Sequence, residues 1–130
     1  MIEQLLDTRV LLLFLQNDPS LPDALARRIE APERRSLVSL ASLWELTQKT
    51  AQGLVRFAAA QRPDFPALLL EEGFEVLPLD WSVMRRAASL PMHHADATDR
   101  LLVAEAISRN IPIVSLDEAF DQYGIERLGE

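Results

Sequence analysis

Residues 96–117 read DATDRLLVAEAISRNIPIVSLD, and this stretch decides the fold class. In its first part, apolar side chains recur at helical spacing behind two aspartates, which predicts an amphipathic helix over residues 96–110. Pro112 stops that pattern, and the apolar run PIVS at residues 112–115 predicts a short buried strand. A helix that leads directly into a buried strand is half of a βαβ unit, so the stretch predicts an α/β fold.

The rest of the chain repeats this alternation in both directions. Further strands are expected at residues 4–7, 36–39, 74–79 and 125–128. Further helices are expected at residues 10–16, 20–29 (capped by Ser20), 54–60, 65–72, 80–90 (capped by Asp80) and 118–123, with another that Ser39 or Ser42 caps and Gly53 ends. Strands that alternate with helices imply a mainly parallel sheet covered by helices on both faces.

The composition fits a single domain over residues 1–130. The chain is 48% hydrophobic and 25% charged, which is the balance of an ordinary globular protein. It contains no cysteine, so disulfides, thiolate metal sites and cysteine nucleophiles are excluded. Its first residues lack a secretory signal pattern, and the apolar run at residues 10–15 is too short to cross a membrane, so we expect a cytoplasmic protein.

The net charge of −7 bears on the partners of the chain. A passive nucleic-acid binder carries a basic surface that replaces the counterions of the phosphates, and this chain has an excess of acids instead. Contact with nucleic acid must therefore depend on local basic residues or on bound metal. The acidic surface otherwise serves solubility alone or a cationic protein partner.

Acidic residues gather at one predicted edge of the sheet. Asp7 ends the first strand and Asp117 follows the strand at residues 112–115, so both are expected at the carboxyl edge, where ligands bind in parallel sheets. Glu45 lies on the helix that follows the second strand, and Asp99 lies in the first turn of the helix over residues 96–110. These acids map onto the same rim, and Asp96 can join them.

Each acid also has an ordinary structural explanation: a helix cap for Asp96, Asp99 or Asp117, an ion pair with Lys49 for Glu45, and a turn for Asp7. Their convergence favours a metal site, because two carboxylates ~5 Å apart repel by about 3 kcal/mol at an effective dielectric near 20. Hard oxygen ligands select Mg²⁺ or Mn²⁺, and these ions suit phosphodiester hydrolysis.

Four segments together resemble PIN-domain proteins, most closely the VapC-type toxins of type II toxin–antitoxin systems. They are residues 5–8 (LLDT), 42–45 (SLWE), 90–102 (LPMHHADATDRLL) and 114–117 (VSLD), in the family's order and spacing over nearly the whole chain. The resemblance implies a three-layer α/β/α PIN-like fold with a central, mainly parallel sheet. It also implies a Mg²⁺-dependent endoribonuclease toxin, with Mn²⁺ as the other candidate ion, that hydrolyses RNA with a metal-activated water. A cognate antitoxin and a homodimer are the implied protein partners.

Carried over residue by residue, the resemblance assigns Asp7, Glu45, Asp99 and Asp117 as the catalytic and metal-binding acids. Asp96 matches an additional acid of a subgroup with a His-x-Asp-x-x-Asp pattern, which runs from His94 to Asp99 in this chain. Thr8 and His94 are candidates for supporting the site, with a turn hydroxyl and a loop histidine as the alternatives.

Arg9 stands where relatives commonly have His or Asn, and the Ala97-Thr98 pair replaces a frequent Pro-Phe pair. Arg9 either contacts a substrate phosphate or pairs with a carboxylate and blocks the metal. The second case defines one rival hypothesis, a non-catalytic PIN-like binding module. The other rival is a PIN nuclease that acts on DNA or in RNA processing. The apolar helix with Val10 and Phe14 is a candidate contact for the antitoxin or a second copy, or else part of the core.

Overall fold

The computed structural model describes residues 1–93 and 96–129. Its centre is a five-stranded sheet in the order β3-β2-β1-β4-β5, in which every neighbouring pair is parallel. The strands are β1 (Ile2–Leu6), β2 (Arg34–Ser39), β3 (Glu75–Leu77), β4 (Ile113–Val114) and β5 (Arg127–Leu128). The predicted parallel sheet is therefore confirmed, with β3 at one edge and β5 at the other.

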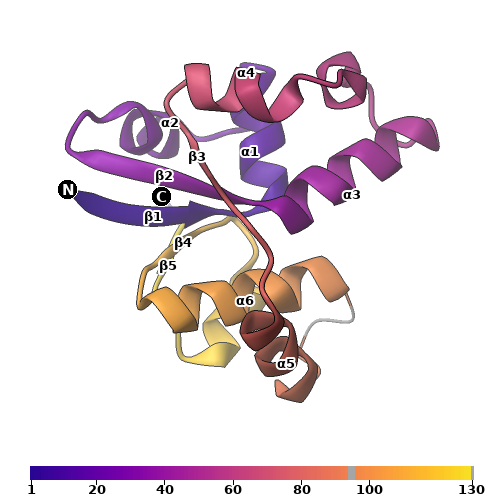
Figure 1. Ribbon diagram of the computed structural model, residues 1–130. Helices are drawn as coiled ribbons and strands as arrows, with labels where there is room; N and C mark the ends of the chain where they lie inside the picture. Colours follow the sequence, from indigo (N-terminus) through magenta and orange to yellow (C-terminus); the bar gives the residue numbers. More distant parts are fainter. Residues whose placement is uncertain (94–95, 130) are drawn as a thin grey trace.

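Helices cover both faces of this sheet (Figure 1). The helices are α1 (Thr8–Leu15), α2 (Asp23–Glu30), α3 (Leu40–Ala51), α4 (Phe65–Glu71), α5 (Trp81–Ser89) and α6 (Ala97–Arg109), with 3-10 helices η1 (Ala58–Gln61) and η2 (Glu118–Tyr123). Figure 1 shows α1 to α4 on one side of the strands and α5 and α6 on the other. The three-layer α/β/α arrangement is as predicted. No helix in the described part of the chain is long and apolar enough to span a membrane.

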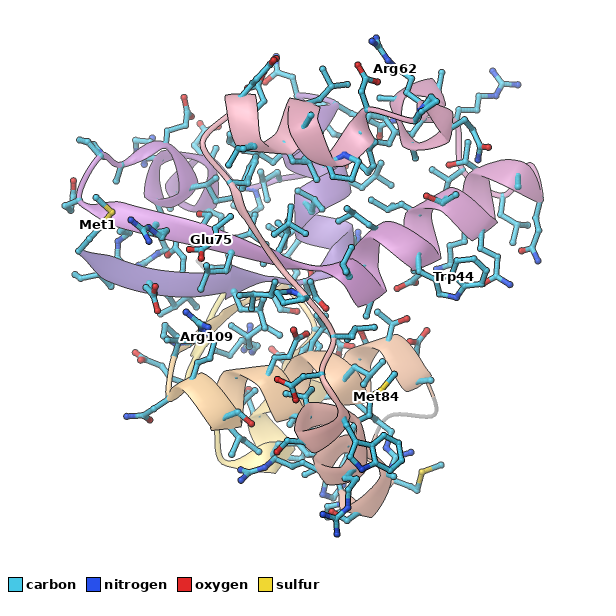
Figure 2. All side chains as sticks on the ribbon, viewed as in Figure 1. Met1, Trp44, Arg62, Glu75, Met84 and Arg109 are labelled. Atoms are coloured by element: carbon cyan, nitrogen blue, oxygen red, sulfur yellow. The ribbon has the colours of Figure 1, made fainter. Side chains whose placement is uncertain are left out.

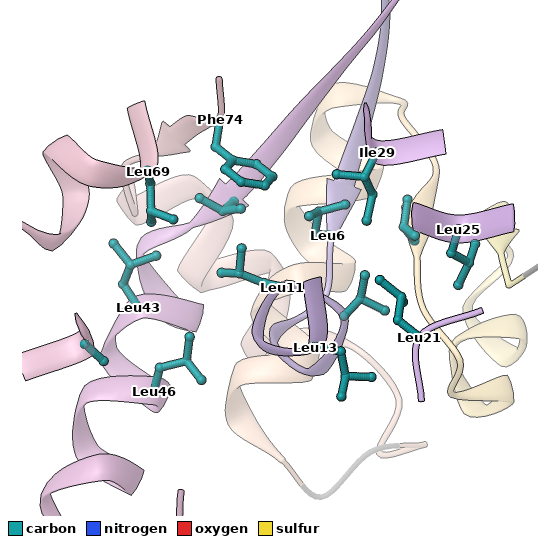
Figure 3. Packing of buried hydrophobic residues seen from close by; sticks show 14 of the residues in the cluster. Leu6, Leu11, Leu13, Leu21, Leu25, Ile29, Leu43, Leu46, Leu69 and Phe74 are labelled. Carbon is teal, nitrogen blue, oxygen red and sulfur yellow. The ribbon is translucent and has the colours of Figure 1, made fainter. Parts of the chain in front are cut away.

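Successive residues of the strands supply the cores of the two faces. Leu6 packs with α1 to α4, as Figure 3 shows, and its neighbour Leu5 packs with α6 and Phe120 on the other face. Both leucines are 0% exposed. Full burial of such a side chain contributes about 1.5–3 kcal/mol, so the sheet anchors both helical layers.

Helix α1 contributes part of its apolar sequence to the core. Val10 and Leu11 are fully buried, and Phe14 packs edge-on against Phe74 at 5.8 Å between ring centroids. Figure 3 shows Leu11 and Leu13 facing the other buried side chains of this cluster. The buried part of the helix thus serves the core, whereas Leu12, Phe14 and Leu15 stay partly exposed, so a contact of this helix with an antitoxin or a second copy remains a prediction.

The prediction that Ser20 caps α2 is wrong. The backbone N–H of Ser20 donates to Asp18 Oδ1 at 2.8 Å, which forms a tight turn before the helix. Helix α2 begins only at Asp23, and its N-cap position is taken by Pro22 without a side-chain hydrogen bond. Ser20 therefore lies in a turn that Asp18 stabilises, three residues before the helix begins.

The predicted helix over residues 54–60 is also largely wrong, since only the 3-10 turn Ala58–Gln61 forms in this region. Gly53 ends α3 with a φ of +76° and turns the chain away from the helical path. The carbonyl of Arg56 then accepts a hydrogen bond of 2.7 Å from the Gln16 side chain. This tertiary contact at the end of α1 overrides a helical preference of the sequence.

The crossovers create a switch point between β1 and β4. The chain leaves β1 toward α1 on one face, whereas it leaves β4 toward η2, whose Phe120 packs on the opposite face with Leu5. Connections that run to opposite faces leave a crevice at the carboxyl ends of the two strands, which is where ligands bind in open α/β sheets. Figure 1 shows the start of α3 and the start of α6 on this same side of the molecule.

Candidate metal centre

A pocket of about 630 Å³ opens at the carboxyl edge of β1 and β4. Its walls contain every acid that the sequence singled out, together with Thr8 and Arg9. The lining residues are Asp7, Thr8, Arg9, Glu45, Lys49, Asp96, Asp99, Leu116, Asp117 and Glu118. His94, the remaining candidate, lies outside the described residues.

Asp7 is the deepest of these acids, with 6% of its surface exposed. It follows β1 directly and caps α1, because its Oδ1 accepts the backbone N–H of Val10 at 2.7 Å. Its Oδ2 accepts a short hydrogen bond of 2.5 Å from the Ser115 hydroxyl. Burial raises the pKa of Asp7, and the hydrogen bonds from Ser115 and Val10 act in the opposite direction. Both oxygens of Asp7 are thus held in a fixed orientation.

Ser115 connects Asp7 to the second acid of the switch point. Its hydroxyl oxygen accepts the backbone N–H of Asp117 at 2.9 Å while it donates to Asp7. Asp117 in turn caps η2 through Oδ1, which accepts the N–H of Ala119 at 3.0 Å. One buried hydroxyl therefore fixes the acids that follow β1 and β4 relative to each other.

Glu45 enters the pocket from α3, which Ser39 caps at the end of β2. Its Oε2 accepts a hydrogen bond of 2.6 Å from Lys49 Nζ, one helical turn further along. The Glu45 side chain is only 13% exposed, and its Oε1 is buried without a hydrogen-bond partner among the described residues. This oxygen would gain a partner if the carboxylate turned to bring it to a cation in the pocket.

Asp96 and Asp99 form the wall supplied by α6. Asp96 caps the helix, since its Oδ1 accepts the backbone N–H of Asp99 at 3.1 Å. The hydrogen bond from Lys49 to Glu45 raises the pKa of Lys49, burial opposes the shift, and the charges of Glu45, Asp96 and Asp99 add to it. The acids of α3 and α6 thus act on one ammonium across the pocket. The capping role expected of Asp96 and its place in the pocket are compatible.

Thr8 and Arg9 lie at the start of α1 and differ in exposure. Thr8 is buried, and its hydroxyl donates to Ser42 Oγ at 2.8 Å, which ties α1 to α3. Arg9 is exposed at the mouth of the pocket, and its charge has the smallest effect on the pKa of Asp7. In the described part of the chain, Arg9 donates no hydrogen bond to a carboxylate, so the structure does not show it as a plug.

Sequence reasoning considered Ser42 as a helix cap, a role that Ser39 takes, and missed its bond with Thr8; it assigned no role to Ser115 and treated Lys49 only as a helical ion-pair partner. A signal was available for Ser115, because it is a polar residue directly after the buried strand β4 and two residues before an acid. The bond that it makes to Asp7 joins positions 108 residues apart, so only the fold reveals it.

The donor chemistry of the pocket fits a hard divalent ion. The candidate ligands are all carboxylates, and oxygen ligands of this kind favour Mg²⁺ or Mn²⁺. The acids are not drawn together into a closed set: no three acids or histidines of the described residues are arranged to hold one metal ion.

Comparison with known proteins gives the family. The model of the PIN domain matches residues 5–126, which is nearly the whole chain. The chain belongs to the PIN-domain family. Because the matched segment runs from the end of β1 to the residue before β5, all the pocket acids of this PIN domain fall inside it. A search of curated proteins finds no significant match.

Solved structures with the same fold include chains of VapBC and FitAcB proteins. VapBC2 from Rickettsia felis, bound to a DNA fragment from its promoter, has a chain with a TM-score of 0.72 at 13% identity, with 98% of both chains covered. FitAcB from Neisseria gonorrhoeae gives 0.67 at 19% identity, with 96% of both chains covered. VapBC-5 from Mycobacterium tuberculosis gives 0.60 at 24% identity, covering 94% of this chain and 90% of the other. At such identities, the likeness establishes the shared PIN fold.

Proposed function

We propose that this PIN-domain protein is a metal-dependent endoribonuclease and the toxin half of a type II toxin–antitoxin pair, folded as one domain over residues 1–130. The observation that carries the proposal is the pocket in which Asp7, Glu45, Asp99 and Asp117 converge from four segments of the chain. Structural likeness to VapBC and FitAB proteins supports the toxin assignment.

The four acids would hold Mg²⁺ or Mn²⁺, with Asp96 as an additional ligand. A bound divalent ion supplies a nucleophile from water and stabilises the negative charge that develops on the phosphate and the leaving oxygen. The protein contributes orientation: Ser115 fixes Asp7, and α3 presents Glu45 from the opposite wall. Arg9 stands exposed at the mouth, where its guanidinium can bind a phosphate of the RNA.

The same acids suit a cationic segment of an antitoxin. An arginine of such a partner can bind a carboxylate in bidentate fashion and occupy the place of the metal. With a net charge of −7, the chain would steer a basic segment toward itself, so association should slow as salt is added. A homodimer is part of the proposal, and exposed Trp44 and Met84, labelled in Figure 2, offer apolar surface for it outside the core.

The test is cleavage of RNA by the purified protein without antitoxin, in the presence of Mg²⁺ and after EDTA. We expect cleavage that needs the metal and growth arrest on induction that the neighbouring antitoxin gene relieves. RNA that stays intact at every metal concentration would favour the non-catalytic module, and cleavage restricted to DNA would favour the other nuclease hypothesis.

A further inference from the structure

The pocket contains one internal cation, Lys49, on the wall opposite α6. It is the only lysine of the chain, which otherwise uses arginine for positive charge. Its Nζ lies 2.6 Å from Glu45 Oε2, and Asp96 and Asp99 also act on its charge. Arg9, the other cation of the lining, is exposed at the mouth.

Lys49 controls access to Glu45. The two oxygens of Glu45 differ: Oε2 is bonded to Lys49, and Oε1 is buried and reached by no hydrogen-bond donor of the described residues. Neither oxygen is therefore presented to the pocket as a ready metal ligand. A divalent ion that draws on Glu45 must replace the ammonium at Oε2 or turn the carboxylate away from it.

Release of Lys49 is physically easy. Its side chain is 43% exposed, whereas the Glu45 side chain is 13% exposed, so the ammonium lies on the solvent side of the pair. A lysine head is a strongly hydrated point charge on a flexible stem, and it regains water when it leaves. The glutamate cannot follow it into solvent, and its buried charge needs another cation in exchange.

We propose that Lys49 is the resident counterion of the metal site, which holds Glu45 while the divalent ion is absent and is displaced from Glu45 when the ion binds. The inference rests on the proposed function, since it requires that the acidic pocket binds a metal. It is consistent with the open arrangement of the described acids, no three of which are placed to hold one ion.

The decisive variant is Lys49→Met, which keeps an apolar stem and removes the charge. Isothermal titration with Mn²⁺ should show binding roughly five- to tenfold tighter than wild type, the equivalent of the one ion pair that the metal no longer has to break. The matched control is Arg62→Met, which breaks the Arg62–Asp64 pair (2.8 Å) and lowers the net charge equally. Figure 2 shows Arg62 far from Trp44 of α3 and Met84 of α5, so its loss should leave Mn²⁺ affinity unchanged.

A second measurement follows the ammonium itself in the wild-type protein. Because Lys49 is the only lysine, lysine labelled with ¹³C and ¹⁵N gives a single side-chain spin system in NMR spectra. Mg²⁺ should move its Cε and Nζ signals toward those of a free lysine, with the same midpoint as a calorimetric titration of the wild-type protein with Mg²⁺. This readout needs neither a variant nor catalytic activity.

The outcomes distinguish failure of the Lys49 exchange from failure of the proposed nuclease function. Equal or weaker Mn²⁺ binding by Lys49→Met, or a lysine signal that stays in place while wild-type protein saturates with metal, overturns the exchange and leaves the nuclease proposal standing. Metal binding by neither wild type nor the variant overturns both. Metal binding by the variant alone would show that Lys49 blocks the site permanently; it would overturn the exchange and the metal dependence proposed for the wild-type protein.

Discussion

Helix α6 carries acids in two different surroundings. At its N-terminal end, Asp96 and Asp99 line an open pocket in which Lys49 supplies positive charge. Six residues beyond Asp99, or about 9 Å along the helix, Glu105 is 3% exposed among apolar neighbours. Burial raises the pKa of Glu105 to about 7, against a hydrogen bond from Ser39.

The difference teaches how this fold handles negative charge. Glu105 stands apart from the pocket acids, its Oε1 has no hydrogen-bond partner among the described residues, and a proton neutralises it near pH 7. The pocket acids share one opening. Asp7, the buried one, accepts hydrogen bonds at both oxygens, and Glu45 is paired with Lys49. Acidity alone therefore does not mark a metal site; a shared and accessible opening does.

The largest expected difference between Asp99 and Glu105 is their effect on catalysis. Asp99→Asn should reduce Mg²⁺-dependent RNA cleavage by roughly a thousandfold, since a divalent ion supplies several kcal/mol of transition-state stabilisation. Unfolding without metal should require the same denaturant concentration or more, because one repelling charge has gone. Rates of cleavage of a labelled RNA, together with urea unfolding curves, provide the measurement.

The control for that experiment is Glu105→Gln, which makes the same chemical change on the same helix away from the pocket. It should cleave RNA at the wild-type rate. If both variants cleave as wild type does, the assignment of Asp99 fails; if both are inactive, α6 tolerates no such change and the comparison of its two ends is wrong.

The next effect concerns pH and stability. Glu105 holds its proton in the folded protein up to about pH 7, whereas an unfolded glutamate loses it near its ordinary pKa of 4.5. The stabilisation is complete below 4.5 and is lost as the pH rises through 7, up to about 3 kcal/mol in total. Glu105→Gln should remove this loss, so its stability advantage over wild type should grow between pH 4.5 and pH 7.

Urea unfolding of wild type and Glu105→Gln at several pH values gives the difference in their free energies of unfolding directly. Asp99→Asn is the comparison, because it keeps Glu105 and should lose the same stability as wild type when Glu105 ionises. A constant difference between Glu105→Gln and wild type from pH 4.5 to pH 8 would mean that Glu105 is ionised in the folded state.

A third effect distinguishes carboxylates that a metal ion neutralises from Glu105, which a proton neutralises. Mg²⁺ at a hundredfold excess over its Kd should stabilise the wild-type fold by about 2.7 kcal/mol, or roughly 10 °C in Tm, and EDTA should reverse the shift. Glu105→Gln should keep the whole shift, and Asp99→Asn should lose most of it. Melting curves with millimolar Mg²⁺ that overlay those with EDTA would contradict a metal site in the pocket.

The sequence was sufficient for the architecture because the strands and helices differ in hydrophobic period. Leu5 and Leu6 serve opposite faces of the sheet, and this alternation is local information. The failures were also local: Ser20 lost its capping role to a turn around Asp18, and residues 54–60 were drawn onto α1 by Gln16. In both places, a hydrogen bond outside the local pattern accompanies a backbone that departs from the predicted helix.

The candidate site was predictable to the level of its acids and no further. Asp7 and Asp117 each follow a strand, and the carboxyl ends of parallel strands lie at the same edge of a sheet, so the sequence predicts that these acids lie together. Nothing in the sequence indicates that Ser115 donates to Asp7, because that bond depends on the neighbouring positions of β1 and β4. To predict polar contacts between neighbouring strands, the register of those strands must be known, and composition and periodicity do not give it.

The smallest effect tests this one hydroxyl. Ser115→Ala should destabilise the protein by about 1–2 kcal/mol, because Asp7 Oδ2 loses a donor and the N–H of Asp117 loses an acceptor at a fully buried position. The hydrogen bond from Ser115 also lowers the pKa of Asp7, so its loss should raise that pKa. Asp7 would then resemble Glu105, a buried acid held mainly by a proton. The acidic limb of the pH profile of Mg²⁺-dependent cleavage should consequently move to higher pH.

Ser115→Thr distinguishes positioning from packing, because threonine keeps the hydroxyl and adds a methyl group. It should restore the wild-type pH profile even where the added methyl costs some stability. Unfolding curves measure the packing effect, and cleavage rates across the pH range measure the effect on Asp7. If Ser115→Ala loses stability and keeps the wild-type pH profile, Ser115 supports the fold only, and Asp7 is set apart from Glu105 by its place at the open edge of the sheet alone.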